Sequence, residues 1–249
     1  MSLRITTFRD ERTLARTLAA QIAAEMAANP RLVLGLPTGR TPIRLYHELG
    51  TLHARGKADF SQAATFNLDE FLGVAPDDPG SYRTFMQHHL FSRINMPPDR
   101  IHFLNGAAQD AAAECRRYEE AIEAAGGIDL QLLGIGTNGH IGFNEPAREL
   151  QPRTHRVTLK AETRRSNASL FGGDGERVPA EALSMGMATI LQARRIVLIA
   201  TGKSKARCIA RLIHGPLTTK LPASFLQLHR DVGILLDEKA AGHVMSIGD

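Results

Sequence analysis

The chain has 249 residues, of which 43% are hydrophobic and 22% charged, and 30 basic against 26 acidic residues leave a formal charge of +4. Two cysteines exclude a disulfide scaffold, and no apolar run is long enough to span a membrane. Without a long Lys/Arg run or any tryptophan, we expect no nucleic-acid partner. The N-terminus lacks the apolar core of a signal peptide, so we expect a cytoplasmic protein with reduced thiols.

Strands and helices alternate along the chain. Short apolar runs predict the strands, and apolar residues spaced three or four apart predict the helices. Strands that are apolar throughout indicate a parallel sheet covered by helices on both faces, so we expect an α/β fold in a single domain, residues 1–249. In chain order we predict a strand over 3–8, a helix over 11–28, a strand over 32–36, a helix from about 41, a strand over 63–68, a helix over 82–93 capped by Ser81, a strand over 101–104, a helix over 108–124, a strand over 128–135, a strand over 195–201, a helix over 204–213 and a strand over 231–236.

Polar residues follow several of these strands, where open α/β sheets bind their ligands. The turn 37–42 (PTGRTP) joins a strand to a helix. Thr38 and Thr41 offer hydroxyl donors there, Arg40 a charged one, and the helix start offers free backbone N–H groups. The turn is interpreted either as a phosphate cradle or as an ordinary capped turn.

Asp69 and Glu70 end the strand over 63–68. Neighbouring residues of an extended strand face opposite ways, so we expect one carboxylate to face the crevice. A carboxylate in a partly dehydrated crevice has a raised pKa and can move protons near neutrality. The other interpretation is a cap for the following segment.

The segment 134–146 (GIGTNGHIGFNEP) sets glycines around His140 at the end of a strand. Its imidazole is suited to proton transfer, and Glu145 could return to orient the ring. No second His or Cys stands at metal spacing, so we expect no metal. A histidine that merely packs in the loop is the alternative.

Lys203 and Lys205 open a helix after another apolar strand. Two positive charges oppose the helix dipole at that end, and an anionic ligand would relieve the conflict. Two solvated lysines would explain the pattern equally.

Together, the residues of these four segments suggest an enzyme that binds a small phosphorylated molecule and moves protons with a carboxylate and a histidine. Aldose–ketose isomerisation and ester or lactone hydrolysis both fit.

Four segments, in this order and at these spacings, resemble the glucosamine-6-phosphate deaminase family: LGLPTGRTP, TFNLDEFLG, LLGIGTNGHIGFNEP and SFLQLH. That family shares a superfamily and a modified Rossmann-like fold with the 6-phosphogluconolactonases. The resemblance covers nearly the whole chain. The lactonases typically carry Asp before the Gly-His pair and a Ser-Leu-Phe-Pro-like run after it. Asn138 and the Phe-Asn-Glu-Pro run of this chain therefore favour the deaminases.

The resemblance implies a role for each matching residue. Asp69 resembles the base that moves a proton from C2 to C1 of the opened sugar. His140 resembles the acid–base that opens the pyranose ring, assisted by Asn138 and Glu145. The implied products are fructose 6-phosphate and ammonia, with no metal or organic cofactor. The positions matching the phosphate-binding residues are Thr38, Gly39, Arg40, Thr41 and Lys205.

The chain departs from the family pattern in three places. Asn138 stands where some members carry Asp, which shifts the pH profile of ring opening. Ser169 stands where many carry a phosphate-binding Arg in a mobile lid, which we expect around residues 160–178, and we expect Arg40 to supply that charge. The allosteric members bind N-acetylglucosamine 6-phosphate through a Ser, an Arg and a Lys. Arg148, His155 and Val157 stand in their places and the C-terminal tail is short, so we expect no such activation.

Three alternatives stay open. A galactosamine-6-phosphate deaminase or isomerase would share Asp69 and His140, and a 6-phosphogluconolactonase is a weaker choice. A sugar-phosphate-binding regulator is the third, but we expect a helix-turn-helix before its sugar domain and no need for the Asp69, His140 and Glu145 set. The partner expected is a small phosphorylated amino sugar, and the chain is expected to be a monomer or a small homo-oligomer.

Overall fold

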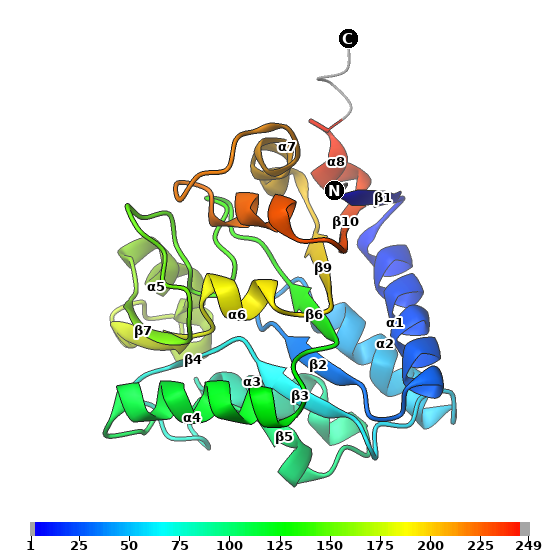
Figure 1. Cartoon of the computed structure of the whole chain (residues 1–249), viewed down its shortest axis with the longest axis horizontal. Coiled ribbons are helices and arrows are strands. Elements are labelled where there is room, and N and C mark those ends of the chain that lie inside the picture. Colours follow the sequence, from blue (N-terminus) through cyan, green and yellow to red (C-terminus); the bar gives the residue numbers. More distant parts are fainter. Residues whose placement is uncertain (1–2, 245–249) are drawn as a thin grey trace.

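A seven-stranded parallel sheet runs through the centre of the computed structural model, which describes residues 3–244 (Figure 1). Every neighbouring pair in this sheet is parallel, as the apolar strands predicted. The strands, in their order across the sheet, are β1 (Arg4–Phe8), β10 (Val232–Asp237), β9 (Arg195–Ala200), β6 (Leu130–Leu133), β2 (Val33–Leu36), β3 (Ala64–Asn67) and β5 (Ile101–His102).

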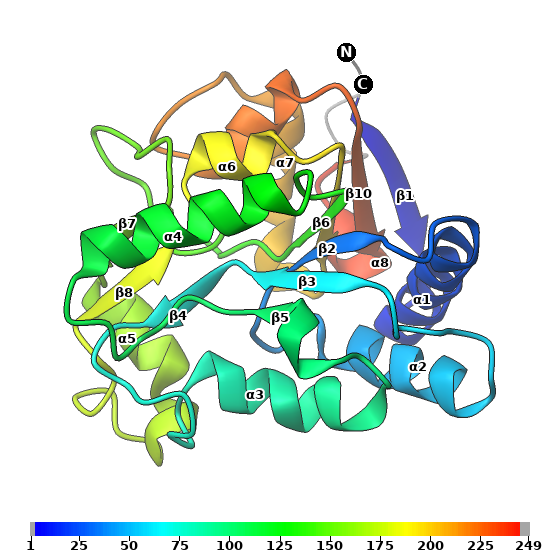
Figure 2. The ribbon, with the colours of Figure 1, turned by 60° about the horizontal axis from the view of Figure 1, so that its bottom comes forward.

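Helices cover both faces of the sheet, so the fold is the α/β fold that the sequence predicted (Figure 2). One face packs against α1 (Glu11–Ala28), α2 (Ile43–Ala54) and α3 (Tyr82–His89). The other packs against α4 (Ala111–Ala124), α6 (Met187–Leu191), α7 (Ala206–His214) and α8 (Glu238–Ala241). Because side chains of a strand alternate between faces, the same strands contribute to both cores.

Helix boundaries follow the local signals closely. The helix over 11–28 has the predicted bounds, and Asp10 caps it by accepting the Thr13 N–H at 2.7 Å. Ser81 caps α3 as expected, but α3 ends at His89 rather than at 93, and a 3₁₀ turn follows. The second helix starts at Ile43 with Pro42 as its N-cap, two residues later than predicted. The 3₁₀ turns are Phe91–Arg93, Pro98–Arg100, Ala168–Phe171, Lys203–Lys205 and Pro222–Leu228.

A second, three-stranded antiparallel sheet is the feature that the sequence analysis missed. It consists of β4 (Asp69–Phe71), β8 (Glu181–Ser184) and β7 (His155–Thr158), in that order. Asp69 and Glu70 therefore do not end a strand, because the chain leaves the large sheet at Leu68 and enters the small one. These strands have three or four residues, too few to show a period of their own.

The expected lid, which we call the lid segment (residues 160–178), follows β7. It contains α5 (Ala161–Asn167), the 3₁₀ turn Ala168–Phe171 and the glycine-rich turn after it. A separate small core of side chains lies between this segment and the small sheet. Both cysteines are free and buried, as predicted. Within residues 3–244, no helix has the length and apolar character needed to cross a membrane.

Candidate active site

The segments singled out in the sequence meet at one edge of the large sheet. They follow β9, β6, β2 and β3, which are four adjacent parallel strands. The carboxyl ends of such strands lie at the same edge, where α/β proteins bind ligands. The segments brought together are 201–205, 134–146, 37–42 and 68–70.

Hydrogen bonds join these segments to the small sheet. The Leu68 N–H donates to Leu36 O at 3.1 Å, so the end of β2 fixes the start of β4. Ser184 pairs with Asp69 across the ladder of the small sheet, and its hydroxyl accepts the Phe143 N–H at 3.1 Å. The loop carrying His140 is thereby fastened to the strand carrying Asp69.

Asp69 has a buried carboxylate without a fixed partner. The residue is 6% exposed, and no donor among residues 3–244 hydrogen-bonds to its side chain. Burial, with the negative charge of Glu70 as the second cause, raises the pKa of Asp69 from 3.8 to about 8. Asp69 is therefore suited to accept a proton.

Glu70 is buried as deeply but is fully engaged. Its carboxylate accepts the N–H groups of Phe71, Tyr82 and Arg83, each at 2.9 Å. Tyr82 and Arg83 begin α3, so Glu70 satisfies N–H groups that a helix leaves unpaired. Burial raises the pKa of Glu70 to about 7 against the lowering effect of these bonds. The capping interpretation is thus confirmed for Glu70, and Asp69 is the carboxylate left free.

Asn138 fixes the tautomer of His140. Its Oδ1 accepts the His140 backbone N–H at 3.1 Å and lies 2.8 Å from Nδ1. Because a backbone N–H can only donate, the atom facing Nδ1 is an acceptor, so Nδ1 carries the proton. In the neutral ring, Nε2 is then the acceptor. Burial lowers the pKa of His140, which keeps the ring neutral near pH 7.

Glycines let the backbone come close to this ring. A Cβ on Gly136 would lie 2.2 Å from His140 Cε1, so any other residue would displace the imidazole. Gly139 has a φ of +86°, and a Cβ there would lie 2.1 Å from Leu221 Cδ1. The position of the His140 ring therefore requires glycine at 136, and the backbone φ and the contact with Leu221 require it at 139.

Glu145 does not hold the His140 ring as expected. The residue is 7% exposed, and its Oε1 accepts the Thr163 hydroxyl. The Nζ atom of Lys160 lies 3.4 Å from its Oε2. Asn138 takes the hydrogen bond predicted for Glu145, because it stands two residues from His140 in the same turn. Glu145 acts on His140 through space, and its negative charge raises the pKa of the imidazole.

The turn 37–42 presents polar groups at the start of α2. Gly39 has a φ of +94°, in a turn that only glycine enters easily, and Arg40 beside it is exposed. The Thr38 side chain hydrogen-bonds to Tyr82, and Thr41 is half-buried. No side chain caps α2. The Ile43 N–H donates to Arg40 O at 3.4 Å, and the next N–H groups, of Arg44 and Leu45, are available to an anion.

Lys205 brings a positive charge to the same edge. It is half-buried, burial lowers the pKa of its ammonium, and no carboxylate of residues 3–244 lies within ion-pair distance. Its charge lowers the pKa of His140. The Cys208 thiol donates to Gly136 O at 3.4 Å and to Lys205 O at 3.1 Å, which joins the two segments.

The sequence analysis did not predict the contacts made by Tyr82, Asn167 and Thr163. The Tyr82 hydroxyl donates to Asn167 Oδ1 at 3.0 Å, so α3 contacts the lid segment. Thr163 contacts Glu145 from the same segment. Only the Ser81 cap, which sets Tyr82 at the start of a helix, gave a signal in the sequence. Ser169 is exposed, like Arg40.

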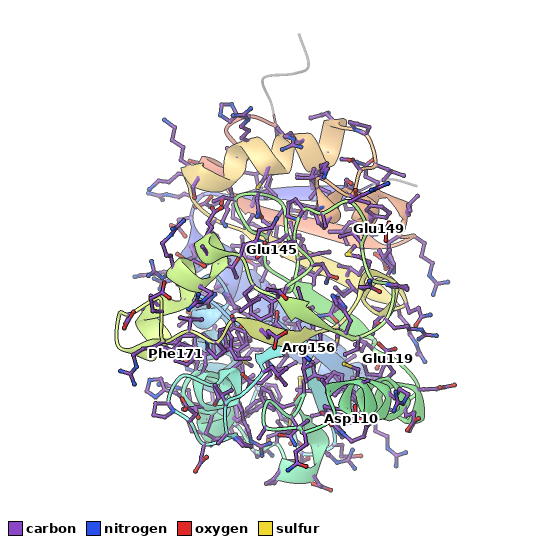
Figure 3. All side chains as sticks on the ribbon, turned by 90° about the vertical axis from the view of Figure 1, so that its left-hand side faces the viewer. Asp110, Glu119, Glu145, Glu149, Arg156 and Phe171 are labelled. Carbon is purple, nitrogen blue, oxygen red and sulfur yellow. The ribbon has the colours of Figure 1, made fainter. Side chains whose placement is uncertain are left out.

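A hollow of about 760 Å³ lies away from this site, between α4 and the segment 153–156. Figure 3 shows Asp110 and Glu119 of α4 well separated from Glu145. The candidate residues for proton transfer and phosphate binding do not line this hollow, so we place the candidate site at the sheet edge where those residues meet. Within residues 3–244, no three His, Cys, Asp or Glu side chains gather as a metal site would need.

Known proteins resemble this chain over most of its length. The model of the family "Glucosamine-6-phosphate isomerases/6-phosphogluconolactonase" matches residues 9–234. A glucosamine-6-phosphate deaminase of Thermoanaerobacter sp. (strain X514) is 51% identical over 212 residues, covering 85% of this chain and 83% of that protein. Glucosamine-6-phosphate deaminase 2 of Bacillus subtilis (strain 168) is 49% identical over 215 residues, or 86% of each chain.

Solved structures give the same result. That of a monomeric glucosamine-6-phosphate deaminase superposes with a TM-score of 0.92 and 43% identity, covering 97% of this chain and 100% of that one. A 6-phosphogluconolactonase from Trypanosoma cruzi, 22% identical with a TM-score of 0.78 over 98% of each chain, shares the fold. Given the match over residues 9–234, the chain belongs to the glucosamine-6-phosphate isomerase/6-phosphogluconolactonase family.

Proposed function

We propose that the chain is a glucosamine-6-phosphate deaminase, which converts its substrate and water to fructose 6-phosphate and ammonia. The observation that carries the proposal is the Asp69 carboxylate, buried and without a hydrogen-bond donor among residues 3–244, at the sheet edge that also holds His140 and Lys205. A base that takes a proton from carbon needs such an environment, because water would weaken it. The relatives named above support the same activity.

The phosphate is held at the rim of the site. Thr38, Gly39 and Thr41 offer hydroxyl and backbone donors, and Arg40 and Lys205 offer positive charge. Arg40 takes the place of the lid arginine missing at Ser169. Anchoring the phosphate fixes where C1 and C2 of the sugar lie, which makes the later proton transfers intramolecular in effect.

His140 opens the sugar ring. Its Nε2, an acceptor in the tautomer set by Asn138, takes the proton of the O1 hydroxyl while the C1–O5 bond breaks. The same proton then passes to O5, which leaves an aldehyde at C1. Glu145 favours the imidazolium formed in between, since its charge raises the pKa of His140.

Asp69 then moves a proton along the open chain. Its carboxylate removes the proton from C2, next to the aldehyde, and the electrons move through C1 to O1. O1 takes a proton from the neighbouring C2 ammonium, which gives a neutral enolamine. Return of the proton to C1 gives a 2-imine. Water adds at C2, the C–N bond breaks, and ammonia leaves with fructose 6-phosphate. No step requires a metal or an organic cofactor, so none is proposed.

The direct test is incubation with glucosamine 6-phosphate and with galactosamine 6-phosphate, measuring ammonia and ketose phosphate. Both should appear in equal amounts with the glucosamine compound and at a lower rate with its epimer. The Asp69→Asn protein is the control. A folded wild-type protein that releases ammonia from neither substrate contradicts the proposal. Ammonia from the galactosamine compound alone favours the alternative deaminase, and hydrolysis of 6-phosphogluconolactone favours the lactonase.

We do not expect activation by N-acetylglucosamine 6-phosphate. Of the three positions that match the family's effector site, Val157 is apolar and packs into the small core, and Arg148 is exposed. Rate curves for glucosamine 6-phosphate should be hyperbolic with or without this compound. A sigmoidal curve that the compound makes hyperbolic contradicts the expectation.

We propose that the chain acts as a monomer, because the solved deaminase that superposes with a TM-score of 0.92 is monomeric. Light scattering during gel filtration tests this.

A phosphorylated amino sugar is too polar to leave a cell, so the cytoplasm is the proposed compartment. Cell fractionation tests this. Nucleic acid is not an expected partner.

A further inference from the structure

The lid segment supplies the polar partners of Glu145. The Thr163 hydroxyl donates to its Oε1, and Lys160 lies 3.4 Å from its Oε2 while donating to Pro146 O at 2.8 Å. Oε2 is buried and has no hydrogen-bond partner among residues 3–244. Thr163 is 6% exposed, so two buried polar groups from different segments meet here. Within the described part of the chain, the Thr163 hydroxyl is the only hydrogen-bond donor to this carboxylate.

The same segment is fastened at its other end. Asn167 Oδ1 accepts the Tyr82 hydroxyl at 3.0 Å. The ring of Phe171 lies 5.3 Å from that of Phe71, centre to centre, and rests on Gly80, where a Cβ would come within 2.4 Å of it. Figure 3 shows Glu145 and Phe171 at separate places along this part of the molecule. The segment is thus held at one end by the contact at Glu145 and at the other by the contacts around Tyr82.

The charge of Glu145 is one of four that act on His140. Glu145, from the loop of His140, and Glu162, from α5, raise the pKa of the imidazole. Lys205, at the start of α7, and Lys160, before α5, lower it, and burial lowers it most. Glu145 is the strongest of the four charges. A change in its position therefore changes the pKa of His140, in addition to the larger effect of burial.

We propose that Thr163 is a positioning residue that couples docking of the lid segment to placement of the Glu145 carboxylate beside His140. The inference rests on the proposed function, in which His140 opens the sugar ring. When the segment is docked, Glu145 is held by Thr163 and the acid–base pair is complete. When the segment is lifted, Glu145 loses both Thr163 and Lys160.

The side chain of Thr163 can be separated from its place in α5. Its carbonyl accepts the Ser166 hydroxyl at 2.8 Å and the Asn167 Nδ2 at 2.9 Å, and neither bond involves the Thr163 hydroxyl. Valine has nearly the shape of threonine, so Thr163→Val removes the hydrogen bond and keeps the packing. Thr163→Ser keeps the hydroxyl and loses a methyl group. Ser166→Ala is the matched control, because it removes a hydroxyl of α5 that does not contact Glu145.

The first measurement is steady-state kinetics with glucosamine 6-phosphate. Thr163→Val should lower kcat about tenfold with a change in KM below about threefold, because positioning acts on the chemical step. Thr163→Ser and Ser166→Ala should stay within about twofold of wild type. A Val variant with unchanged kcat overturns the proposal. So does a Ser variant as impaired as the Val variant, since packing would then be the cause.

The second measurement does not depend on turnover. The ring protons of His140, assigned by comparison with His140→Gln, are followed by NMR as the pH changes. Thr163→Val should lower the pKa of His140, because Glu145 is no longer held beside it, and Ser166→Ala should not. An unchanged or raised pKa overturns the proposal. If the wild-type protein releases no ammonia, the proposed function is wrong. The titration still tests whether Thr163 positions Glu145 beside His140, with or without that activity.

Discussion

The two walls of the site differ in their contact with water. The wall formed by the large sheet offers Arg40, which is exposed, and Lys205, which is half-buried. The wall formed by the small sheet offers Asp69 and Glu70, and the loop after β6 adds Glu145 beneath the lid segment; the three residues are 6%, 2% and 7% exposed. Positive charge is thus kept at the wet rim and negative charge in the dry interior. A phosphate can be anchored at the rim while protons move where water is excluded.

This difference has a cost in stability on the dry side. A carboxylate without donors is unfavourable when buried, and such a group at position 69 is typical of a functional site. Glu70 offsets part of this cost by accepting three N–H groups, and its pKa is raised less than that of Asp69. Substitutions on the dry wall should therefore change kcat and stability, and substitutions on the wet wall should change KM.

The largest effect is expected for Asp69→Asn, which should lower kcat at least about 1,000-fold. At pH 8.5 the same substitution should raise the melting temperature by about 5 °C. The reason is that the pKa of the carboxyl is 3.8 in the unfolded chain but about 8 in the folded one. Between these values the folded state keeps a proton that the unfolded state has released, so stability falls as pH rises and the full cost is present above pH 8. Calorimetry at pH 5 and pH 8.5 measures this.

An Asp69→Asn protein that is less stable than wild type at pH 8.5 would contradict the assignment of a dry, unpaired carboxylate. At pH 3, where the carboxyl is protonated in both states, the two proteins should have equal melting temperatures. This second condition is the control for any change in packing.

The next effect is on ring opening. His140→Gln should lower kcat about 100-fold with glucosamine 6-phosphate, because the amide cannot shuttle the proton from O1 to O5. Affinity for 2-amino-2-deoxyglucitol 6-phosphate, whose chain is permanently open, should change less than about threefold. Calorimetric titration gives this affinity. A parallel loss of affinity for the open-chain compound would mean that His140 holds the sugar rather than opens it.

The contrast between the walls also explains what the sequence could predict. Thr38, Asp69, His140 and Lys205 follow strands that are buried on both faces, and such strands leave a continuous apolar run in the sequence. Their convergence then follows from the parallel sheet alone. The residues of the proposed phosphate loop and of the proposed proton transfer could therefore be predicted from the sequence.

The small sheet could not be predicted from the sequence, because its strands are too short to show a periodic pattern. Its outer strand β7 alternates between half-buried and exposed residues over only four positions, and β4 has three residues. The partner of Glu145 lies 18 residues away in α5, and no local rule joins a carboxylate to a threonine at that separation. The hydrogen bond expected between Glu145 and His140 does not form. Asn138, two residues from His140, accepts that bond, and Glu145 accepts the Thr163 hydroxyl.

A smaller effect is expected on the wet wall. Arg40→Ala should raise KM for glucosamine 6-phosphate about tenfold and leave kcat within about threefold, because the phosphate is anchored equally in the ground state and the transition state. Adding Ser169→Arg should recover most of the affinity if Arg40 replaces the lid arginine. Steady-state kinetics of the three proteins decides this. An unchanged KM in Arg40→Ala removes Arg40 from the phosphate site.

The smallest and most specific effect is on the pH profile of kcat/KM. Because the ionised form of Asp69 is the proposed base, activity should fall as pH drops below about 8. The lowered pKa of Lys205 should bring the alkaline limb below the usual range of a lysine. Glu70→Gln removes a neighbouring negative charge, so the acid limb should move to lower pH by less than the total shift, since burial is its larger cause. Lys205→Arg, which stays charged, should move only the alkaline limb, upward. If one substitution moved both limbs, Asp69 and Lys205 would titrate as a coupled pair. The proposed separation between a phosphate-binding charge at the rim and a base in the buried interior would then be wrong.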